Sequence, residues 1–175
     1  MLLTRNDDSS LTLSERSEFA YQMKADLFIS LHVNARPSSH TRDPSGIETY
    51  YLYAQDLLPP SNQRGFFFIN QPKNKSLIKL LDSKLQKNIT GSKQLATSIQ
   101  ANLINFLQHK KITVIDRGVK KSTLRVLLRS PVPCALVEVG FITHAEEAQN
   151  LGSKKYQDWL ARGISRGIEN YLKNN

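Results

Sequence analysis

Residues 25–33 read ADLFISLHV, and residues 133–141 read PCALVEVGF. Both runs are short, apolar on both faces and rich in β-branched or aromatic residues, which is typical of a strand covered by helices on each side. Residues 46–53, GIETYYLY, predict a further strand. Because helical patterns separate these runs, we predict an α/β fold with a mostly parallel, twisted sheet flanked by helices on both faces.

Helical patterns occur on both sides of the predicted strands. Thr12 and Glu15 have the spacing of a capping box, which predicts a helix over 13–24. Leucines at helical spacing predict a short helix over 75–87, ended by the Asn-Ile-Thr-Gly sequence that follows. Apolar residues at positions i, i+4, i+8, i+11 and i+12 predict an amphipathic helix over 95–107, which we expect to cover a face of the sheet.

The last third of the chain contains shorter candidates and one long helix. Two short apolar runs, 113–115 and 124–128, are strand candidates. Residues 156–172 place their large apolar side chains on one helical face. Gly163 and Gly167, four residues apart in that helix, predict that it approaches the sheet closely.

Size and composition narrow the class of protein. The 175 residues fit a single domain. Lys and Arg outnumber Asp and Glu by 24 to 15, a net charge of +9, which favours polyanions or anionic surfaces as partners. One cysteine, Cys134, excludes an internal disulfide and a cysteine-based zinc cage. No nucleic-acid-binding signature occurs, and no apolar run reaches the roughly 20 residues of a membrane helix, so we expect neither nucleic-acid binding nor an integral membrane protein.

Two ionisable residues stand near the carboxyl ends of the two buried strands. His32 follows LFISL, and Glu138 follows CALV. Ligands of open parallel sheets bind at this edge, where a neutral imidazole can bind zinc. A carboxylate among apolar neighbours has a raised pKa, which suits a general base. From spacing alone, a hydrogen-bonded core histidine and a paired buried carboxylate are the more ordinary interpretation.

Two segments that contain these residues resemble a known family. Residues 30–35, SLHVNA, resemble the S-[IL]-H-x-N-A segment of the zinc-dependent N-acetylmuramoyl-L-alanine amidases of bacterial cell-wall turnover. Residues 136–143, LVEVGFIT, resemble the same family's L-V-E-x-G-F-[IL]-[ST] segment. The similarity covers about residues 2–53 and 92–172, with both segments in the family's order.

The resemblance implies a reaction and a role for each residue. His32 corresponds to a zinc ligand, and Glu138 to the glutamate that passes a proton from water to the leaving amine. The bond cleaved is the amide between N-acetylmuramic acid and L-alanine of the stem peptide, in cell-wall turnover or cell separation. The resemblance also implies zinc as cofactor, peptidoglycan as substrate and an activator protein as a further partner. It places the protein, which we expect to be a monomer, in the bacterial cell envelope, periplasmic or secreted, with the targeting signal outside this chain.

The sequence departs from the family pattern at its beginning. The family carries a ligand histidine and a ligand glutamate upstream of its TR-x-x-D segment, and residues 1–4 can provide neither. Two explanations are open: the amidase domain is N-terminally incomplete, or the chain is a relative that binds peptidoglycan without catalysis. We favour the first, because His32 and Glu138 both keep their neighbours. We interpret the remaining histidines as exposed polar residues: His40, His109 and His144.

Weaker candidates complete the predicted site. Asn34 lies two residues after His32 and is a candidate for orienting substrate, although a turn-forming role fits it equally. Arg117 and Arg129 belong to a basic run that could bind stem-peptide carboxylates or an anionic wall polymer, and a solvated basic face is the alternative. Residues 54–91 are interpreted as an insertion, either a regulatory segment that covers the groove or a surface decoration.

Overall fold

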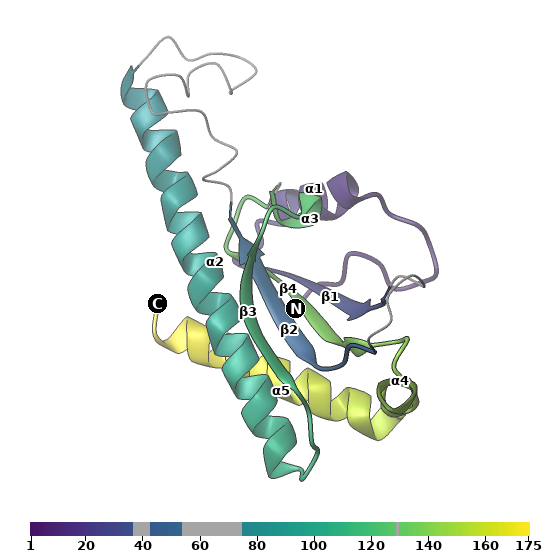
Figure 1. The fold of residues 1–175 in the computed structure, drawn as a ribbon. Helices are drawn as coiled ribbons and strands as arrows, with labels where there is room; N and C mark the ends of the chain where they lie inside the picture. Colours follow the sequence, from purple (N-terminus) through teal and green to yellow (C-terminus); the bar gives the residue numbers. More distant parts are fainter. Residues whose placement is uncertain (37–42, 54–74, 129) are drawn as a thin grey trace.

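The computed structural model describes residues 1–36, 43–53, 75–128 and 130–175, with side chains in its longest helix described from residue 83 onward. Helices and strands are interspersed along the chain, as predicted for an α/β fold, although the first two strands and the last two helices are consecutive (Figure 1). Their order is α1 (Leu13–Gln22), β1 (Phe28–Asn34), β2 (Ile47–Leu52), α2 (Lys75–His109), β3 (Asp116–Ser122), α3 (Arg125–Leu128), β4 (Cys134–Phe141), α4 (Ala145–Leu151) and α5 (Lys154–Lys173).

The four described strands form one mixed sheet in the order β1-β4-β2-β3. β1 runs parallel to β4, and β2 runs parallel to β3, but the central pair, β2 and β4, is antiparallel. The prediction of a mostly parallel sheet is therefore confirmed for the outer two pairings and wrong for the central one. An apolar pattern on both faces indicates that a strand is covered on both sides, and it does not fix the direction of its neighbour.

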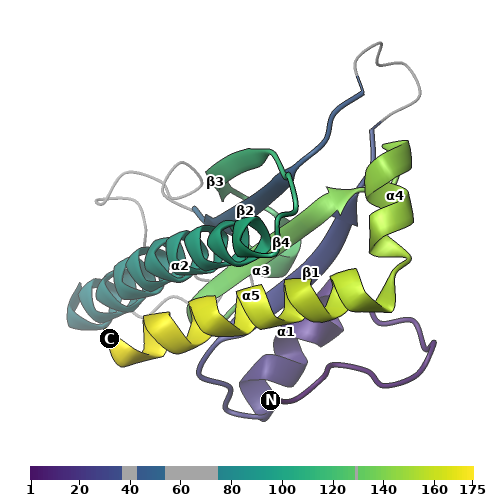
Figure 2. The same cartoon turned by 90° about the horizontal axis from the view of Figure 1, so that it is seen from below.

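Helices cover both faces of the sheet, as predicted. α2 and α5 lie side by side on one face, and α1 and α3 lie on the other (Figures 1 and 2). The larger core lies under α2 and α5, and it includes Leu95, Ile99, Leu103 and Leu107. The smaller core, under α1 and α3, includes Phe28, Leu52, Val126, Leu127 and Leu136.

α2 is one continuous helix of 35 residues, so the predicted break after residue 87 is wrong. Gly91 lies inside the helix because of packing: a Cβ at this position would come 2.9 Å from Pro133 Cγ and 3.0 Å from the Tyr171 hydroxyl oxygen. Ile89, in the first half of α2, belongs to the smaller core, whereas the second half of the helix fills the larger one. α2 therefore contributes to both cores.

α5 confirms the predicted helix at the C-terminal end, but its glycines serve a different neighbour. A Cβ on Gly167 would lie 2.5 Å from Ile99 Cα, and a Cβ on Gly163 would lie 3.0 Å from Leu103 Cα. Both contacts are with α2, so the prediction that these glycines bring the helix close to the sheet is wrong. Small residues four apart on one helix face allow two helix backbones to approach, whichever element lies opposite.

The shorter predictions had mixed outcomes. The capping box at α1 is confirmed, because the Thr12 hydroxyl accepts from the Glu15 amide and the Glu15 carboxylate accepts from the Thr12 amide. The strands predicted over 113–115 and 124–128 are wrong: β3 begins at Asp116, and the second run forms the short helix α3. Short apolar runs are ambiguous between helix and strand, since they contain too few residues to show a period.

The structure describes only the second part of the proposed insertion over residues 54–91. Residues 54–74, the first part of the proposed insertion, lie outside the described residues, and residues 75–91 begin α2. Within the part of the chain that the structure describes, no helix combines the length and apolar character needed to cross a membrane.

Candidate active site

Three ionisable side chains lie in one row across the sheet. In the parallel pairing of β1 with β4, His32 is opposite Glu138, and in the antiparallel pairing of β4 with β2, Glu138 is opposite Glu48. Directly opposite residues of neighbouring strands point to the same face of a sheet. This is the face of α1 and α3, because Leu136, two residues before Glu138, belongs to the smaller core. The register therefore brings His32 and Glu138 together, as the sequence predicts for the ends of neighbouring strands.

Glu138 holds an unpaired carboxylate oxygen. Its Oε2 atom is buried and has no hydrogen-bond partner among the described residues. Burial, and secondarily the charge of Glu48, raises the pKa of Glu138 to about 7. The described residues therefore do not show Glu138 as a paired buried carboxylate. Its raised pKa suits a group that exchanges protons near neutral pH.

His32 lies in the middle of β1. The residue as a whole is exposed, while part of its imidazole ring is enclosed by neighbouring residues. Partial burial of the imidazole, and secondarily the Arg16 charge, lowers the pKa of His32. The neutral form, which is the form that binds metals, is therefore favoured. Because this side chain is exposed, the structure does not place it as a core histidine.

Glu48, by contrast, is a buried carboxylate, only 2% exposed, with a partner for every oxygen. Its Oε1 accepts from Asn34 Nδ2 at 3.0 Å and from the Tyr50 hydroxyl at 2.7 Å. Its Oε2 accepts from Arg117 Nε at 2.8 Å and from Lys120 Nζ. Burial by itself would raise the pKa of Glu48, but the hydrogen bonds from Lys120, Arg117 and Tyr50, together with the Lys120 charge, outweigh it and lower the pKa.

A bulge in β3 places the two cations that contact Glu48. Ile47 pairs with Asp116 and Thr49 pairs with Val119, so Arg117 and Gly118 together face the single residue Glu48. Gly118 has a φ of +76°, the left-handed conformation that such a bulge requires. The extra residue lets Arg117 and Lys120, three positions apart, both reach the same carboxylate.

The predicted substrate-binding residues can now be located. Asn34 donates to Glu48, and its own Oδ1 accepts from the Ala35 amide at 2.8 Å, so it lies at the site and is also bonded to the backbone that follows β1. Arg117 lies at the site, between Glu48 and the Phe141 ring, whose centroid is 5.2 Å from Cζ. Arg129 lies outside the described residues.

Sequence reasoning missed Glu48. A signal was present, because Glu48 is a charged residue inside the apolar run GIETYYLY, just as Glu138 is inside CALVEVGF. A charge in a doubly covered strand must be paired or perform chemistry, since burying it alone is too costly. Its partners could not be found in the same way, because they come from three different strands.

The described histidines outside the row have structural roles. His144 precedes α4, and its Nδ1 accepts from the Glu147 amide at 3.4 Å. His109 ends α2 as an exposed residue, with Nδ1 2.7 Å from the Asn105 carbonyl oxygen. His40 lies outside the described residues. The interpretation of His109 as exposed is confirmed, whereas His144 is partly buried as a helix cap.

The described residues were tested for a zinc site by their donor chemistry. A hydrolytic zinc is held by about three protein ligands. Within residues 1–36, 43–53, 83–128 and 130–175, no three His, Cys, Asp or Glu side chains are placed to hold a metal ion. His32 is a suitable single donor, whereas Glu48 already accepts four hydrogen bonds. Among the described residues the row therefore offers one candidate ligand, His32, and does not complete a zinc site by itself.

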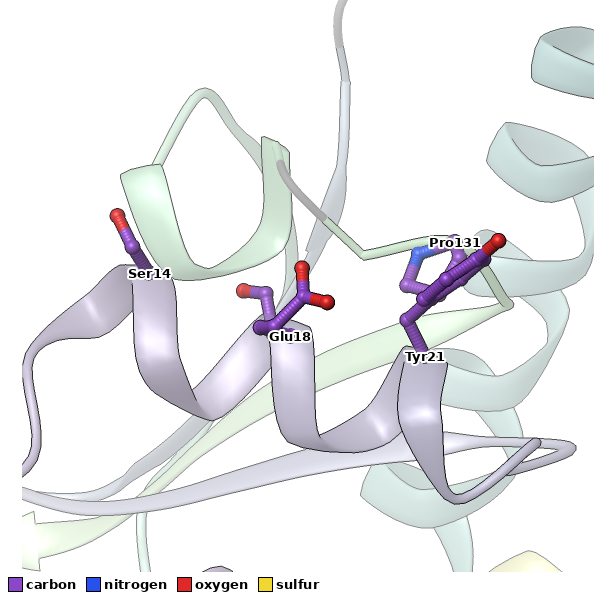
Figure 3. Close-up of a pocket in the computed structure, with 5 residues that line it drawn as sticks. Ser14, Glu18, Tyr21 and Pro131 are labelled. Carbon is purple, nitrogen blue, oxygen red and sulfur yellow. The ribbon is translucent and has the colours of Figure 1, made fainter.

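A surface hollow lies elsewhere on the molecule. It lies beside α1, has a volume of about 370 Å³, and is lined by Ser14, Ser17, Glu18, Tyr21 and Pro131 (Figure 3). None of His32, Glu48 and Glu138 lines it. Its lining has one carboxylate and no second group that would form a reactive pair, so the row of ionisable residues is the better candidate for chemistry.

Comparison with known proteins identifies the family. The family model described as N-acetylmuramoyl-L-alanine amidase matches residues 1–170. The chain belongs to the N-acetylmuramoyl-L-alanine amidase family. In this amidase-family chain, His32 and Glu138 lie on adjacent strands of one sheet.

Individual relatives support the same assignment. This amidase-family chain is 35% identical to YqiI of Bacillus subtilis over 168 residues and 33% identical to the N-acetylmuramoyl-L-alanine amidase LytC of the same organism over 172 residues. These alignments cover 96% and 98% of the chain, which spans 62% of the length of YqiI and 27% of the length of LytC. The CwlD amidase of Clostridioides difficile, solved in complex with the GerS lipoprotein, superimposes with a TM-score of 0.68 at 26% identity, covering 99% of this chain and 76% of CwlD.

Proposed function

We propose that this amidase-family chain hydrolyses the amide bond between N-acetylmuramic acid and L-alanine of the stem peptide in peptidoglycan. The observation that carries the proposal is the buried Oε2 of Glu138, which has no partner among the described residues and lies in a row with His32. A carboxylate without internal partners has free lone pairs for a water or an amine of the substrate. Family membership supplies the class of bond.

Glu138 performs the proton transfers in this proposal. Its carboxylate accepts a proton from the water that attacks the amide carbonyl carbon, and the new carbon–oxygen bond forms as the carbonyl becomes an oxyanion. When the carbon–nitrogen bond breaks, the same proton passes to the leaving amine of L-alanine. The products are a carboxylic acid on the muramic acid, which loses its proton to solvent, and a free peptide amine, and Glu138 returns to its starting state.

We further propose that the reaction depends on zinc, with His32 as one ligand. The neutral, exposed imidazole of His32 supports this role. The other ligands would come from outside the described residues.

Substrate binding is assigned to the polar residues around Glu48. Arg117 donates a hydrogen bond from Nε to Glu48 and one from a terminal nitrogen to the Ser45 carbonyl oxygen at 3.4 Å. Its other terminal N–H groups have no acceptor among the described residues. These N–H groups are suited to a carboxylate of the stem peptide. Asn34 borders the same site, and Arg129 stays a proposal from the sequence.

The biological setting is also proposed. A cell-wall substrate requires location in the cell envelope, and the net charge of +9 favours association with its anionic polymers. The complex of CwlD with GerS supports regulation by a partner protein. Residues 54–91 stay a proposal from the sequence, as an insertion that is either a regulatory segment or a surface decoration, although Ile89 at its end packs into the smaller core.

The test is product analysis. The full-length protein is incubated with purified peptidoglycan and zinc, and soluble products are analysed by mass spectrometry. We expect stem peptides with a free N-terminal L-alanine amine and intact glycan strands, and no such release with Glu138→Gln. Binding of peptidoglycan by a zinc-free protein without peptide release would instead support a non-catalytic relative.

A further inference from the structure

Glu48 lies at the centre of a cluster that links three strands. It is on β2, its donors Arg117 and Lys120 are on β3, and its donor Asn34 is on β1. Asn34 reaches it across β4, the strand that carries Glu138. The carboxylate of Glu48 therefore fixes polar side chains on both sides of the proposed catalytic glutamate.

The cluster carries more positive than negative charge. Glu48 contributes one negative charge and its two cationic partners contribute two positive charges, so one positive charge remains uncompensated within the trio. The Glu48 side chain is 3% exposed, whereas the side chains of Arg117 and Lys120 are 32% and 37% exposed. The anion is thus buried beneath the cations, and the cations have a surface that a ligand can reach.

The orientation of both cations is fixed from several directions. The Arg117 guanidinium lies against the Phe141 ring, and Lys120 Nζ lies 5.8 Å from the centroid of the Tyr50 ring. Beneath them, the bulge at Gly118 is stabilised by Asp116, whose Oδ1 accepts from the Gly118 amide at 2.8 Å. The Asp116 carboxylate also accepts from Gln100 of α2 at 2.6 Å, which connects the bulge to the core.

We propose that Glu48 is a positioning residue that fixes Arg117 and Lys120 as a carboxylate-binding pair beside Glu138, so that the site prefers stem peptides with a free carboxylate. This inference rests on the proposed function and names the substrate feature that the same site recognises. Two adjacent cations would otherwise repel each other and move into solvent, and the buried anion between them holds them together. Their remaining N–H groups then form charge-assisted hydrogen bonds to the substrate carboxylate.

The experiment compares two soluble muropeptides that differ only in whether the carboxylates of the stem peptide are free or amidated. The ratio of kcat/KM for the free acid to kcat/KM for the amide is measured for wild type, Glu48→Gln, Lys120→Met and Lys121→Met. Lys121→Met is the matched control, because it removes the same charge from the next residue of β3. The Nζ atom of Lys121 lies 4.4 Å from the centroid of the Tyr53 ring.

We expect wild type to prefer the free acid by about tenfold or more, through a lower KM. Glu48→Gln and Lys120→Met should bring the ratio close to one, chiefly by raising KM for the free acid, and Lys121→Met should leave it unchanged. A merely structural role for Glu48 would lower turnover of both substrates equally and preserve the ratio. That outcome, or a wild-type ratio near one, would overturn the proposal.

A second variant covers the case in which Glu48→Gln does not fold. Glu48→Asp keeps the charge but shortens the side chain, so we expect a raised KM for the free acid with little change for the amide. An unchanged KM for the free acid would contradict the positioning role.

Failure of the proposed function is recognised separately. If wild type cleaves neither muropeptide, the amidase proposal fails, and the affinities of the two muropeptides for the uncleaving protein still test the carboxylate preference. Equal affinities there would overturn the present inference as well.

Discussion

Glu48 and Glu138 lie directly opposite each other across the antiparallel pair of β2 and β4, yet their carboxylates differ sharply in how many hydrogen bonds they accept. Glu48 accepts four hydrogen bonds, while Glu138 Oε2 accepts none from the described residues. The pKa of Glu48 is consequently lowered and that of Glu138 is raised to about 7. The lowered pKa keeps Glu48 ionised, whereas the raised pKa lets Glu138 exchange its proton near neutral pH, which fits the binding and acid–base roles proposed for the two.

Replacement of Glu138 by glutamine tests the proton-transfer role. Glutamine keeps the size of the side chain and removes its ability to accept and return a proton. We expect kcat to fall by roughly 100-fold to 10,000-fold, the usual contribution of a general acid–base group. Zinc content and the far-UV circular dichroism spectrum should stay near those of wild type. Appreciable residual turnover would assign proton transfer to another group.

The pH dependence of stability provides an independent test of the environment of Glu138. The folded-state pKa is about 7, above the reference value of 4.5, so between these values the folded state binds more protons than the unfolded state. The contribution of Glu138 to stability is therefore present at low pH and is lost as the pH rises from about 4.5 to about 7.

The measurement is the difference in unfolding free energy between wild type and Glu138→Gln, both metal-free, by urea denaturation at several pH values. His32 titrates in an overlapping range but is common to both proteins, so it cancels to first order. We expect Glu138→Gln to gain stability relative to wild type as the pH rises through this window. A pH-independent difference would mean that the pKa of Glu138 is not raised.

His32→Ala tests the metal-ligand role. Loss of an imidazole donor should reduce zinc occupancy after dialysis against limiting zinc, measured by inductively coupled plasma mass spectrometry, and activity should fall in parallel. The exposure of His32 predicts little loss of stability in the metal-free protein. His109→Ala, an exposed residue at the end of α2, is the control and should bind zinc as wild type does. Unchanged occupancy in His32→Ala would refute the ligand assignment.

Gly167→Ala tests the close packing of α5 on α2. The added Cβ would lie 2.5 Å from Ile99 Cα and 2.9 Å from Ile99 N, so the two helix backbones must separate. We expect destabilisation of about 1–3 kcal/mol in urea denaturation, as for other overpacked cores. Gly152→Ala is the control, because its Cβ would approach no atom closer than 3.4 Å. Equal stability of the two variants would contradict the helix contact.

The features that the sequence predicted well are those with local causes. The capping box of Thr12 and Glu15 involves four consecutive residues, and the doubly covered strands show their burial in their own composition. These patterns were sufficient to locate His32 and Glu138 at neighbouring positions, and the motif resemblance pointed to the family that the comparison then identified.

The features that it missed depend on contacts between distant segments. The direction of β2 relative to β4 decides that Glu48 faces Glu138, and the bulge at Gly118 decides that Arg117 and Lys120 share one carboxylate. Similarly, Gly91 reads as a helix end in sequence, and only the position of Pro133 explains why a glycine belongs inside α2. No local pattern carries this information.

The reach of α2 couples the two sides of the molecule in folding. Ile89 fills the core beneath the site face, and Leu103 fills the core on the opposite face. Because both cores contain side chains of the same helix, neither core can unfold without the other losing packing contacts with α2. The two layers should therefore melt as one cooperative unit, with amide protons of β4 among the slowest to exchange. The geometry around Glu138 is then protected by the global stability of the domain, so a mutation as distant as Gly167 lowers activity only by lowering the folded fraction.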